Sequence, residues 1–176
     1  YYTKQYEINV KDKEENNSTN LIRININNLS LLLHFININK NKFDCIIIPD
    51  ISCLNNLIKK EVYIIYCIIN NNNVTSAYFL KDSEMIYFDK NTKKKALDLF
   101  ASISNDDYNT FINVFSEIIK KESKNYNYIN IEYISDNTIF EKYFINSRER
   151  IISPTAYFLY NYIHKPISPN KILIII

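Results

Sequence analysis

The feature that most constrains this chain is a missing residue type, because none of its 176 residues is glycine. Glycine supplies the positive φ angles of many tight turns and lets a backbone approach a phosphate closely. The P-loop and the dinucleotide-binding fingerprint both depend on glycine, so neither can be present. A chain of this length can form one domain with its own hydrophobic core. We therefore expect residues 1–176 to form a single domain without a glycine-built phosphate site.

Tight turns in such a chain need another residue that tolerates positive φ, and asparagine is the usual substitute. Two apolar stretches, "EVYIIYCII" at 61–69 and "VTSAYFL" at 74–80, are separated by the asparagine run 70–73. Two-residue hairpin loops commonly require residues with positive φ, which asparagine can supply. The pattern therefore predicts a β-hairpin that is closed by asparagine.

Three segments have the apolar spacing of amphipathic helices. The first begins near Asn27 and places four side chains on one face, which are Leu29, Leu32, Leu33 and Ile36. The second, "DISCLNNLIKK", begins with Asp50, a favourable N-cap residue. The third and strongest pattern covers 106–121 and places Asp106 and Asp107 in the first turn, where the helix dipole favours negative charge.

Strands are predicted for most of the remaining apolar segments, which are 21–24, 84–89, 95–103 and 128–134. "FDCIIIP" predicts a buried strand that ends at Pro49, and "KILIII" predicts a closing strand at 171–176. Another short helix (137–144) and the aromatic segment 153–163 lie before the closing strand. This order predicts an α/β (α+β) fold in which helices flank a mixed, mostly antiparallel central sheet.

Charge and cysteine content exclude several classes of function. The net charge is +2, which is too small to indicate a nucleic-acid partner. Cys45, Cys53 and Cys67 form no C-x-x-C motif, so we expect neither a metal site nor a disulfide framework. No apolar run approaches the ~18 residues of a membrane span, and no signal peptide opens the chain. We expect a cytoplasmic protein without a transmembrane segment.

The chain ends in an unusual run, "PNKILIII". Termini commonly fray, but a terminus this apolar should be buried. Burial would carry the α-carboxylate of Ile176 into the protein, and burying an unpaired charge is costly. The sequence therefore suggests that a cationic partner meets this carboxylate, unless the strand simply ends at solvent.

Several segments, taken in order, resemble the C-terminal half of the glycylpeptide N-myristoyltransferase family. "NTIFEKYF" followed by "AYFLYNY" and a terminal apolar strand is similar to the closing run of that family. "VYIIYCIINNNNVTSAYFL" resembles its hairpin, and "KKKALDLFAS" resembles its K-A-A-Y-S-F-Y strand. The resemblance covers nearly the whole chain and implies a GNAT-like acyltransferase fold.

The resemblance also implies an activity, the transfer of myristate from myristoyl-CoA to the N-terminal glycine of proteins. In that family a preceding half binds most of the myristoyl-CoA, which is a co-substrate rather than a cofactor, and the C-terminal half forms the peptide groove. The carboxylate of Ile176 would be the catalytic base. The peptide-binding positions would include Leu99, which replaces a serine, together with Glu149, Thr155 and Tyr157.

Two alternatives remain open at the level of sequence. Leu99 and the longer segment "NSRERIISP" depart from the family pattern and favour a catalytically inactive GNAT-like interaction or structural module. An independent small-molecule acetyltransferase is disfavoured, because such enzymes bind pyrophosphate through a glycine-containing loop. His34 and His164 lie in no pattern that indicates a catalytic triad.

Overall fold

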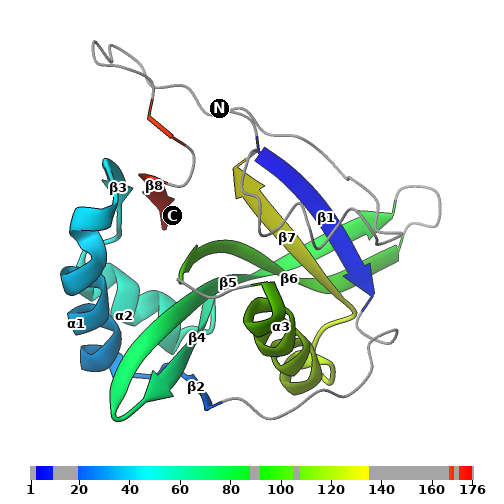
Figure 1. Cartoon of the computed structure of the whole chain (residues 1–176). Coiled ribbons are helices and arrows are strands. Elements are labelled where there is room, and N and C mark those ends of the chain that lie inside the picture. Colours follow the sequence, from blue (N-terminus) through cyan, green and yellow to red (C-terminus); the bar gives the residue numbers. More distant parts are fainter. Residues whose placement is uncertain are drawn as a thin grey trace.

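The computed structural model describes residues 3–9, 20–87, 92–104, 108–134, 167–168 and 171–175. The helices and strands follow one another in this order (Figure 1): β1 (Thr3–Asn9), β2 (Leu21–Arg23), α1 (Leu29–Asn39), the 3-10 helix η2 (Lys40–Lys42), β3 (Cys45–Ile47), α2 (Ile51–Lys59), β4 (Tyr63–Asn70), β5 (Asn73–Tyr87), β6 (Thr92–Ile103), α3 (Tyr108–Glu122), β7 (Tyr128–Ile134) and β8 (Ile172–Ile174).

The main sheet has six strands in the order β1-β7-β6-β5-β4-β2. Every neighbouring pair is antiparallel except β6 and β7, which are parallel and are connected through α3. The predicted mixed, mostly antiparallel sheet is therefore confirmed. The closing strand β8 forms a second, two-stranded sheet with β3 and does not join the main one.

The asparagine-closed hairpin forms as predicted. β4 and β5 are joined by Asn71 and Asn72, whose φ angles are 50° and 63°. Both lie in the left-handed region, which asparagine tolerates better than most residues. Side chains along β4 alternate between the two faces of the sheet, and both faces are covered, so Tyr63 through Ile68 are all buried. This explains the nearly continuous apolar run in the sequence.

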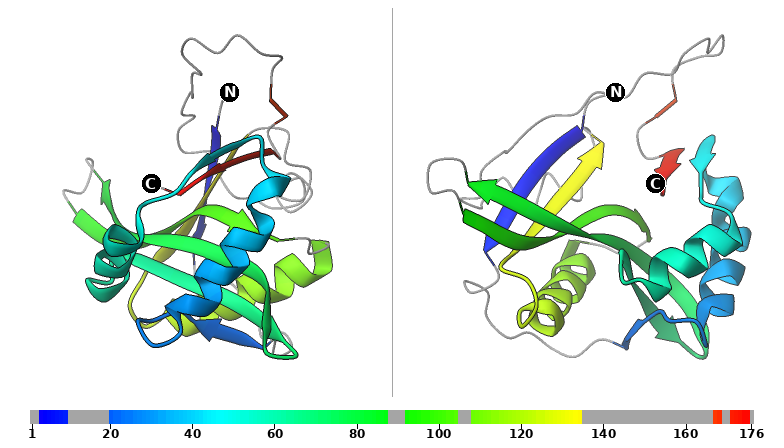
Figure 2. Two further views of the ribbon diagram at one scale, coloured as in Figure 1. Left: turned by 90° about the vertical axis from the view of Figure 1, so that its left-hand side faces the viewer. Right: turned by 180° about the vertical axis from the view of Figure 1, so that it is seen from behind.

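Helices cover the two faces of the sheet, with α3 on one face and α1 and α2 on the other (Figures 1 and 2). The apolar side of α3 packs on the sheet through five buried residues, which are Phe111, Val114, Phe115, Ile118 and Ile119. On α1 the predicted face is confirmed, with Leu33 partly buried and the others buried beside Phe35. The carboxylate of Asp50 accepts a hydrogen bond from the Cys53 backbone N–H at 2.8 Å, which caps α2 and lowers the pKa of Asp50.

Two predictions about individual segments need correction. β3 covers only Cys45–Ile47, and Ile46 and Ile47 are 37% and 45% exposed, because this strand pairs with β8 outside the main sheet. The segment 84–89 is not a separate strand, since β5 continues unbroken to Tyr87 along its partner β6. The predicted positions of Asp106 and Asp107, in the first turn of the third helix, lie outside the described residues, which resume at Tyr108.

The predicted helix 137–144 and the aromatic segment 153–163 lie outside the described residues.

Candidate functional site

The candidate site lies where the parallel strands β6 and β7 separate. Their ladder runs from the pair Ala96–Tyr128 to the pair Leu99–Ile131 and then ends. β6 continues to Ile103, while β7 continues along β1 and turns away from β6 (Figure 1). Ligands of α/β proteins commonly bind at the carboxyl ends of parallel strands where the sheet opens in this way. We call this place the β6–β7 split.

A β-bulge in β6 marks the same position. Leu99 pairs with Leu80 of β5 and Ala101 pairs with Phe79, so Phe100 has no partner in the register. A bulge of one residue reverses which side chains point to each face. Leu99 accordingly packs toward α3, whereas Ala101 packs toward α1 and α2. Bulges are frequent beside functional sites because they redirect side chains.

The side chain of Phe100 contacts two residues on the sheet face opposite α3. Its ring lies 5.3 Å from the ring of Tyr63, measured between centroids, and the two planes are tilted by 49°. The ammonium of Lys81 lies 5.2 Å from the centroid of the Phe100 ring, within cation–π range. Burial, followed by the influence of Cys53, raises the pKa of Tyr63, so its phenol is protonated at neutral pH.

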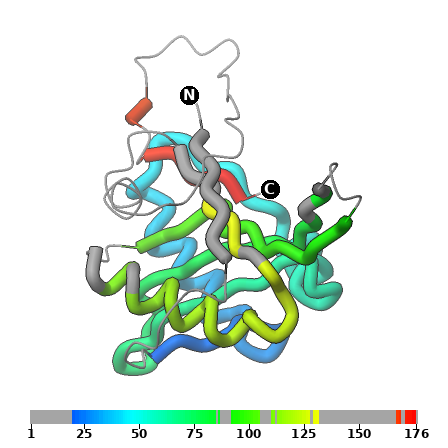
Figure 3. The backbone as a smooth tube through the Cα atoms, turned by 90° about the vertical axis from the view of Figure 1, so that its right-hand side faces the viewer, coloured from blue at the N-terminus to red at the C-terminus, as the bar shows by residue number. Residues whose placement is uncertain are grey.

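The C-terminal strand reaches the same face and contacts β6. Leu173 and Ile175 are 2% and 0% exposed, and they pack in one cluster with Phe79 of β5 and Ile103 of β6. The Ile175 N–H donates a hydrogen bond to the Ile47 carbonyl at 2.8 Å, which extends the pairing of β8 with β3. The C-terminal strand is drawn in red in Figure 3. The predicted burial of the apolar terminal run is therefore confirmed for these two residues.

Of the sequence-predicted site residues, only Leu99 lies in the described part of the chain. It occupies the last pair of the β6–β7 ladder and is 1% exposed, in the core beneath α3. Its role in substrate binding stays a prediction. The other four predicted site residues lie outside the described part of the chain, so their distances from one another stay untested; they are Ile176, Glu149, Thr155 and Tyr157.

One polar pair at the split was missed by sequence reasoning. The side-chain amide of Asn130 on β7 donates a hydrogen bond of 2.7 Å to Asp98 Oδ1 on β6. Both residues interrupt apolar strands, as "ALDLF" and "INI" show, and that interruption is a usable signal. The sequence does not predict that the two side chains are close, because their distance depends on the register of two parallel strands.

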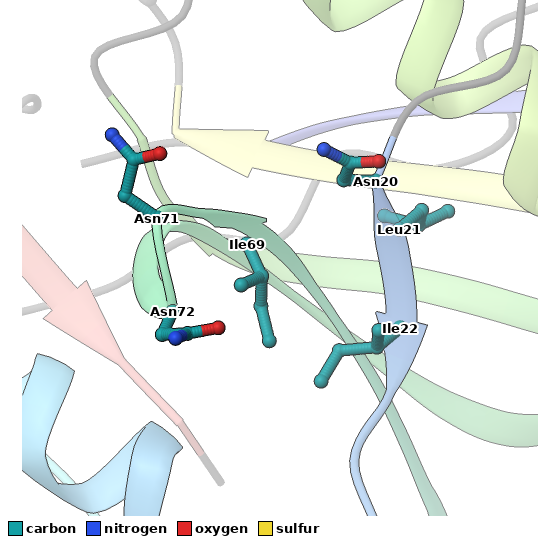
Figure 4. Close-up of a pocket in the computed structure, with 6 residues that line it drawn as sticks. All are labelled: Asn20, Leu21, Ile22, Ile69, Asn71 and Asn72. Atoms are coloured by element: carbon teal, nitrogen blue, oxygen red, sulfur yellow. The ribbon is translucent and has the colours of Figure 1, made fainter.

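An open pocket lies away from the split, between β2 and the β4–β5 turn (Figure 4). Its volume is about 400 Å³, and it is lined by aliphatic and amide side chains, which are Asn20, Leu21, Ile22, Ile69, Asn71 and Asn72. None of these side chains titrates near neutral pH, so the pocket offers no acid, base or nucleophile. Its residues provide no basis for catalysis.

The described ranges hold neither a metal-binding cluster nor a membrane-spanning helix. Within them, no three His, Cys, Asp or Glu side chains gather in a way that could hold a metal ion. None of the helices there is long and apolar enough to cross a membrane.

Comparison with known proteins gives matches in structure alone. No protein-family model and no curated protein sequence matches the chain. A structure of Saccharomyces cerevisiae N-myristoyltransferase with bound myristoyl-CoA is similar, with a TM-score of 0.60 and 11% sequence identity. The match covers 80% of this chain and 44% of that one, so the chain spans less than half the length of the yeast enzyme.

Two acetyltransferases are also similar. An aminoglycoside acetyltransferase from an uncultured soil metagenomic sample has a TM-score of 0.58 at 11% identity, over 81% of this chain and 95% of its own. A GCN5-related N-acetyltransferase from Anabaena variabilis has a TM-score of 0.57 at 12% identity, over 87% of this chain and 38% of its own. The chain has a GNAT-like fold. The predicted fold class is thus confirmed. Sequence identities this low show a shared fold and do not show a shared activity.

Proposed function

We propose that the chain is the peptide-binding half of a glycylpeptide N-myristoyltransferase. The ordered sequence motifs and the similarity to part of the yeast enzyme support this proposal. The observation that carries it is the burial of Leu173 and Ile175 on the sheet face beside β6. Packing of these side chains would hold the last residue, Ile176, close to the β6–β7 split.

The proposed chemistry begins with a proton transfer. An α-amino group has a pKa of about 7.7–8.0 and is mostly protonated at neutral pH, so it is not a nucleophile. The carboxylate of Ile176 would pair with this ammonium and accept one proton from it. The neutral amine would then attack the thioester carbonyl, forming a C–N bond. The C–S bond would break, and the leaving CoA thiolate would take up the proton that the nitrogen loses. Glu149, Thr155 and Tyr157 would contact the peptide, whereas Leu99 is buried beneath α3.

The acyl-CoA would be bound mainly by another half of the same protein. The absence of glycine supports this division, because this chain has no glycine-built phosphate loop.

The test uses the natural protein that contains this chain, with its C terminus determined by mass spectrometry. The protein is incubated with myristoyl-CoA and a glycine-initiated peptide, and the acylated peptide is measured together with released CoA. We expect equimolar amounts of both products, and little product when one residue is appended after Ile176. An Ile176→Leu variant is the matched control and should remain active, because the chemistry uses only the main-chain carboxylate.

Two results would contradict the proposal. Full activity of the extended protein would remove the carboxylate mechanism. Absence of any acylated peptide with the natural protein would favour the second candidate, a catalytically inactive GNAT-like interaction module. The deep burial of Leu99, where the family has serine, is the observation that supports this second candidate.

A further inference from the structure

A polar pair of side chains joins the two parallel strands close to the β6–β7 split, and the proposed acyl transfer gives this pair no role. Asp98 and Asn130 are register partners on β6 and β7, and their hydrogen bond is 2.7 Å long. Both side chains are half-buried. The side-chain oxygen of Asn130 is buried and has no hydrogen-bond partner. We call these two residues the Asp98–Asn130 pair.

The pair faces the side of the sheet that also holds the C-terminal strand. Its neighbours Leu97 and Leu99 on β6, and Ile129 and Ile131 on β7, all pack in the core under α3. Because alternate side chains of a strand point to opposite faces, Asp98 and Asn130 point away from α3. They form the last pair but one before the β6–β7 split, on the face where Leu173 and Ile175 are packed.

Asp98 makes no direct ion pair with the lysine beside it on the sheet. Lys81 is its register partner on β5, but the Lys81 ammonium lies over the ring of Phe100. Among the described residues, the structure gives the Asp98 carboxylate one hydrogen bond, from Asn130, and no ion pair. A half-buried carboxylate that makes no direct ion pair loses hydration on folding, which raises the free energy of the folded state. A bound cation would remove that cost.

A primary ammonium ion matches the acceptors that remain. It carries three N–H donors, and the second oxygen of Asp98 can accept one of them while Asn130 holds the first oxygen. A metal ion fits less well, because no group of three ligating side chains of the kind metals prefer lies within the described ranges.

We propose that the Asp98–Asn130 pair binds a primary ammonium group of the acyl acceptor at the β6–β7 split. The acceptor is either a peptide amino terminus or a small polyamine, which present the same chemistry. This inference rests on the proposed acyl transfer for its meaning, but the binding itself needs no acyl donor. Asp98 orients the incoming amine, and Asn130 holds the carboxylate in place.

The experiment measures binding without acyl-CoA, by calorimetry and by NMR of the Asn130 side-chain amide. The probes are a glycine-initiated heptapeptide without Lys or Arg, its N-acetylated form, and spermidine. Asp98→Asn removes the charge with little change in size and should weaken binding by roughly tenfold or more. Glu84→Gln is the matched control, since Glu84 is an exposed carboxylate of the same hairpin, 3.3 Å from Lys93, and should bind as the wild type does.

Each outcome has a defined meaning. Peptide binding that disappears on N-acetylation assigns the site to a peptide amino terminus, and binding of spermidine alone assigns it to a polyamine. The inference is overturned if neither probe shifts the Asn130 amide of the wild-type protein, or if Asp98→Asn binds as tightly as the wild type. If the protein binds an amine through Asp98 but acylates no peptide, the proposed function is wrong and the proposed ammonium site is supported.

Discussion

Replacing Tyr66 by phenylalanine should destabilise the protein more than the loss of one oxygen suggests. The Tyr66 hydroxyl on β4 donates a hydrogen bond of 2.6 Å to Glu122 Oε1 at the end of α3. The two residues are 3% and 2% exposed, so the carboxyl group of Glu122 has almost no contact with water. Within the described residues this is the one hydrogen bond that the Glu122 side chain makes.

The size of the effect follows from what remains after the substitution. Phenylalanine keeps the ring and its packing, including the Lys121 ammonium 5.9 Å from the ring centroid. It leaves Glu122 buried without a donor, and an unsatisfied buried group costs its full desolvation penalty. We expect the free energy of unfolding to fall by about 2–3 kcal/mol at neutral pH. That is a large part of the total stability of a typical domain.

The assay is urea unfolding followed by far-ultraviolet circular dichroism. The chain has 0 tryptophan and 15 tyrosine residues, so a fluorescence signal would itself change with the substitution. The double variant Tyr66→Phe/Glu122→Leu removes both polar partners and should recover most of the loss. A loss below about 0.5 kcal/mol in the single variant, or no recovery in the double variant, would refute the reasoning.

Three further predictions concern other parts of the sheet. Burial raises the pKa of the Tyr66 and Tyr126 phenols, so above about pH 10 the unfolded chain loses these protons before the folded protein does. For each of the two phenols, the free energy of unfolding should then fall by about 1.4 kcal/mol per pH unit. The Tyr126→Phe variant should show a smaller fall in unfolding experiments at alkaline pH. Burial also raises the pKa of the Cys67 thiol to about 12, so iodoacetamide should modify exposed Cys53 on the order of 1,000 times faster, and equal rates in peptide mapping would contradict this. Asn72 has a φ of 63°, so Asn72→Val should cost about 1–2 kcal/mol in urea unfolding, whereas Asn72→Gly should not.

Local patterns predicted the elements that depend on local physics. The apolar spacing of 106–121 identified α3 to within two residues, and the asparagine run identified the turn at Asn71 and Asn72. Asp50 was recognised as an N-cap because its effect needs only the next turn of chain. These signals come from residues a few positions apart, where helix periodicity, capping and turn geometry act directly.

Local sequence patterns do not predict which strands pair when the strands are far apart in the chain. "FDCIIIP" looked like a buried strand, yet β3 pairs with β8 from the far end of the chain and leaves Ile47 45% exposed. Strand partners depend on which surfaces meet after folding, and a short apolar strand fits many partners equally well. The Asp98–Asn130 pair was hidden for the same reason, since a parallel register is set by the packing of α3 against the sheet.

The bulge at Phe100 connects these observations, because it decides what the candidate site contains. Without it, strict alternation from Leu99 would turn Ile103 toward α3. With it, Ile103 faces α1 and α2 and packs beside Leu173 and Ile175 of the C-terminal segment. Asp98 lies before the bulge and keeps its place on that same face. One unpaired residue thus brings a carboxylate on β6 and the apolar end of the chain to one face of the sheet, beside the β6–β7 split.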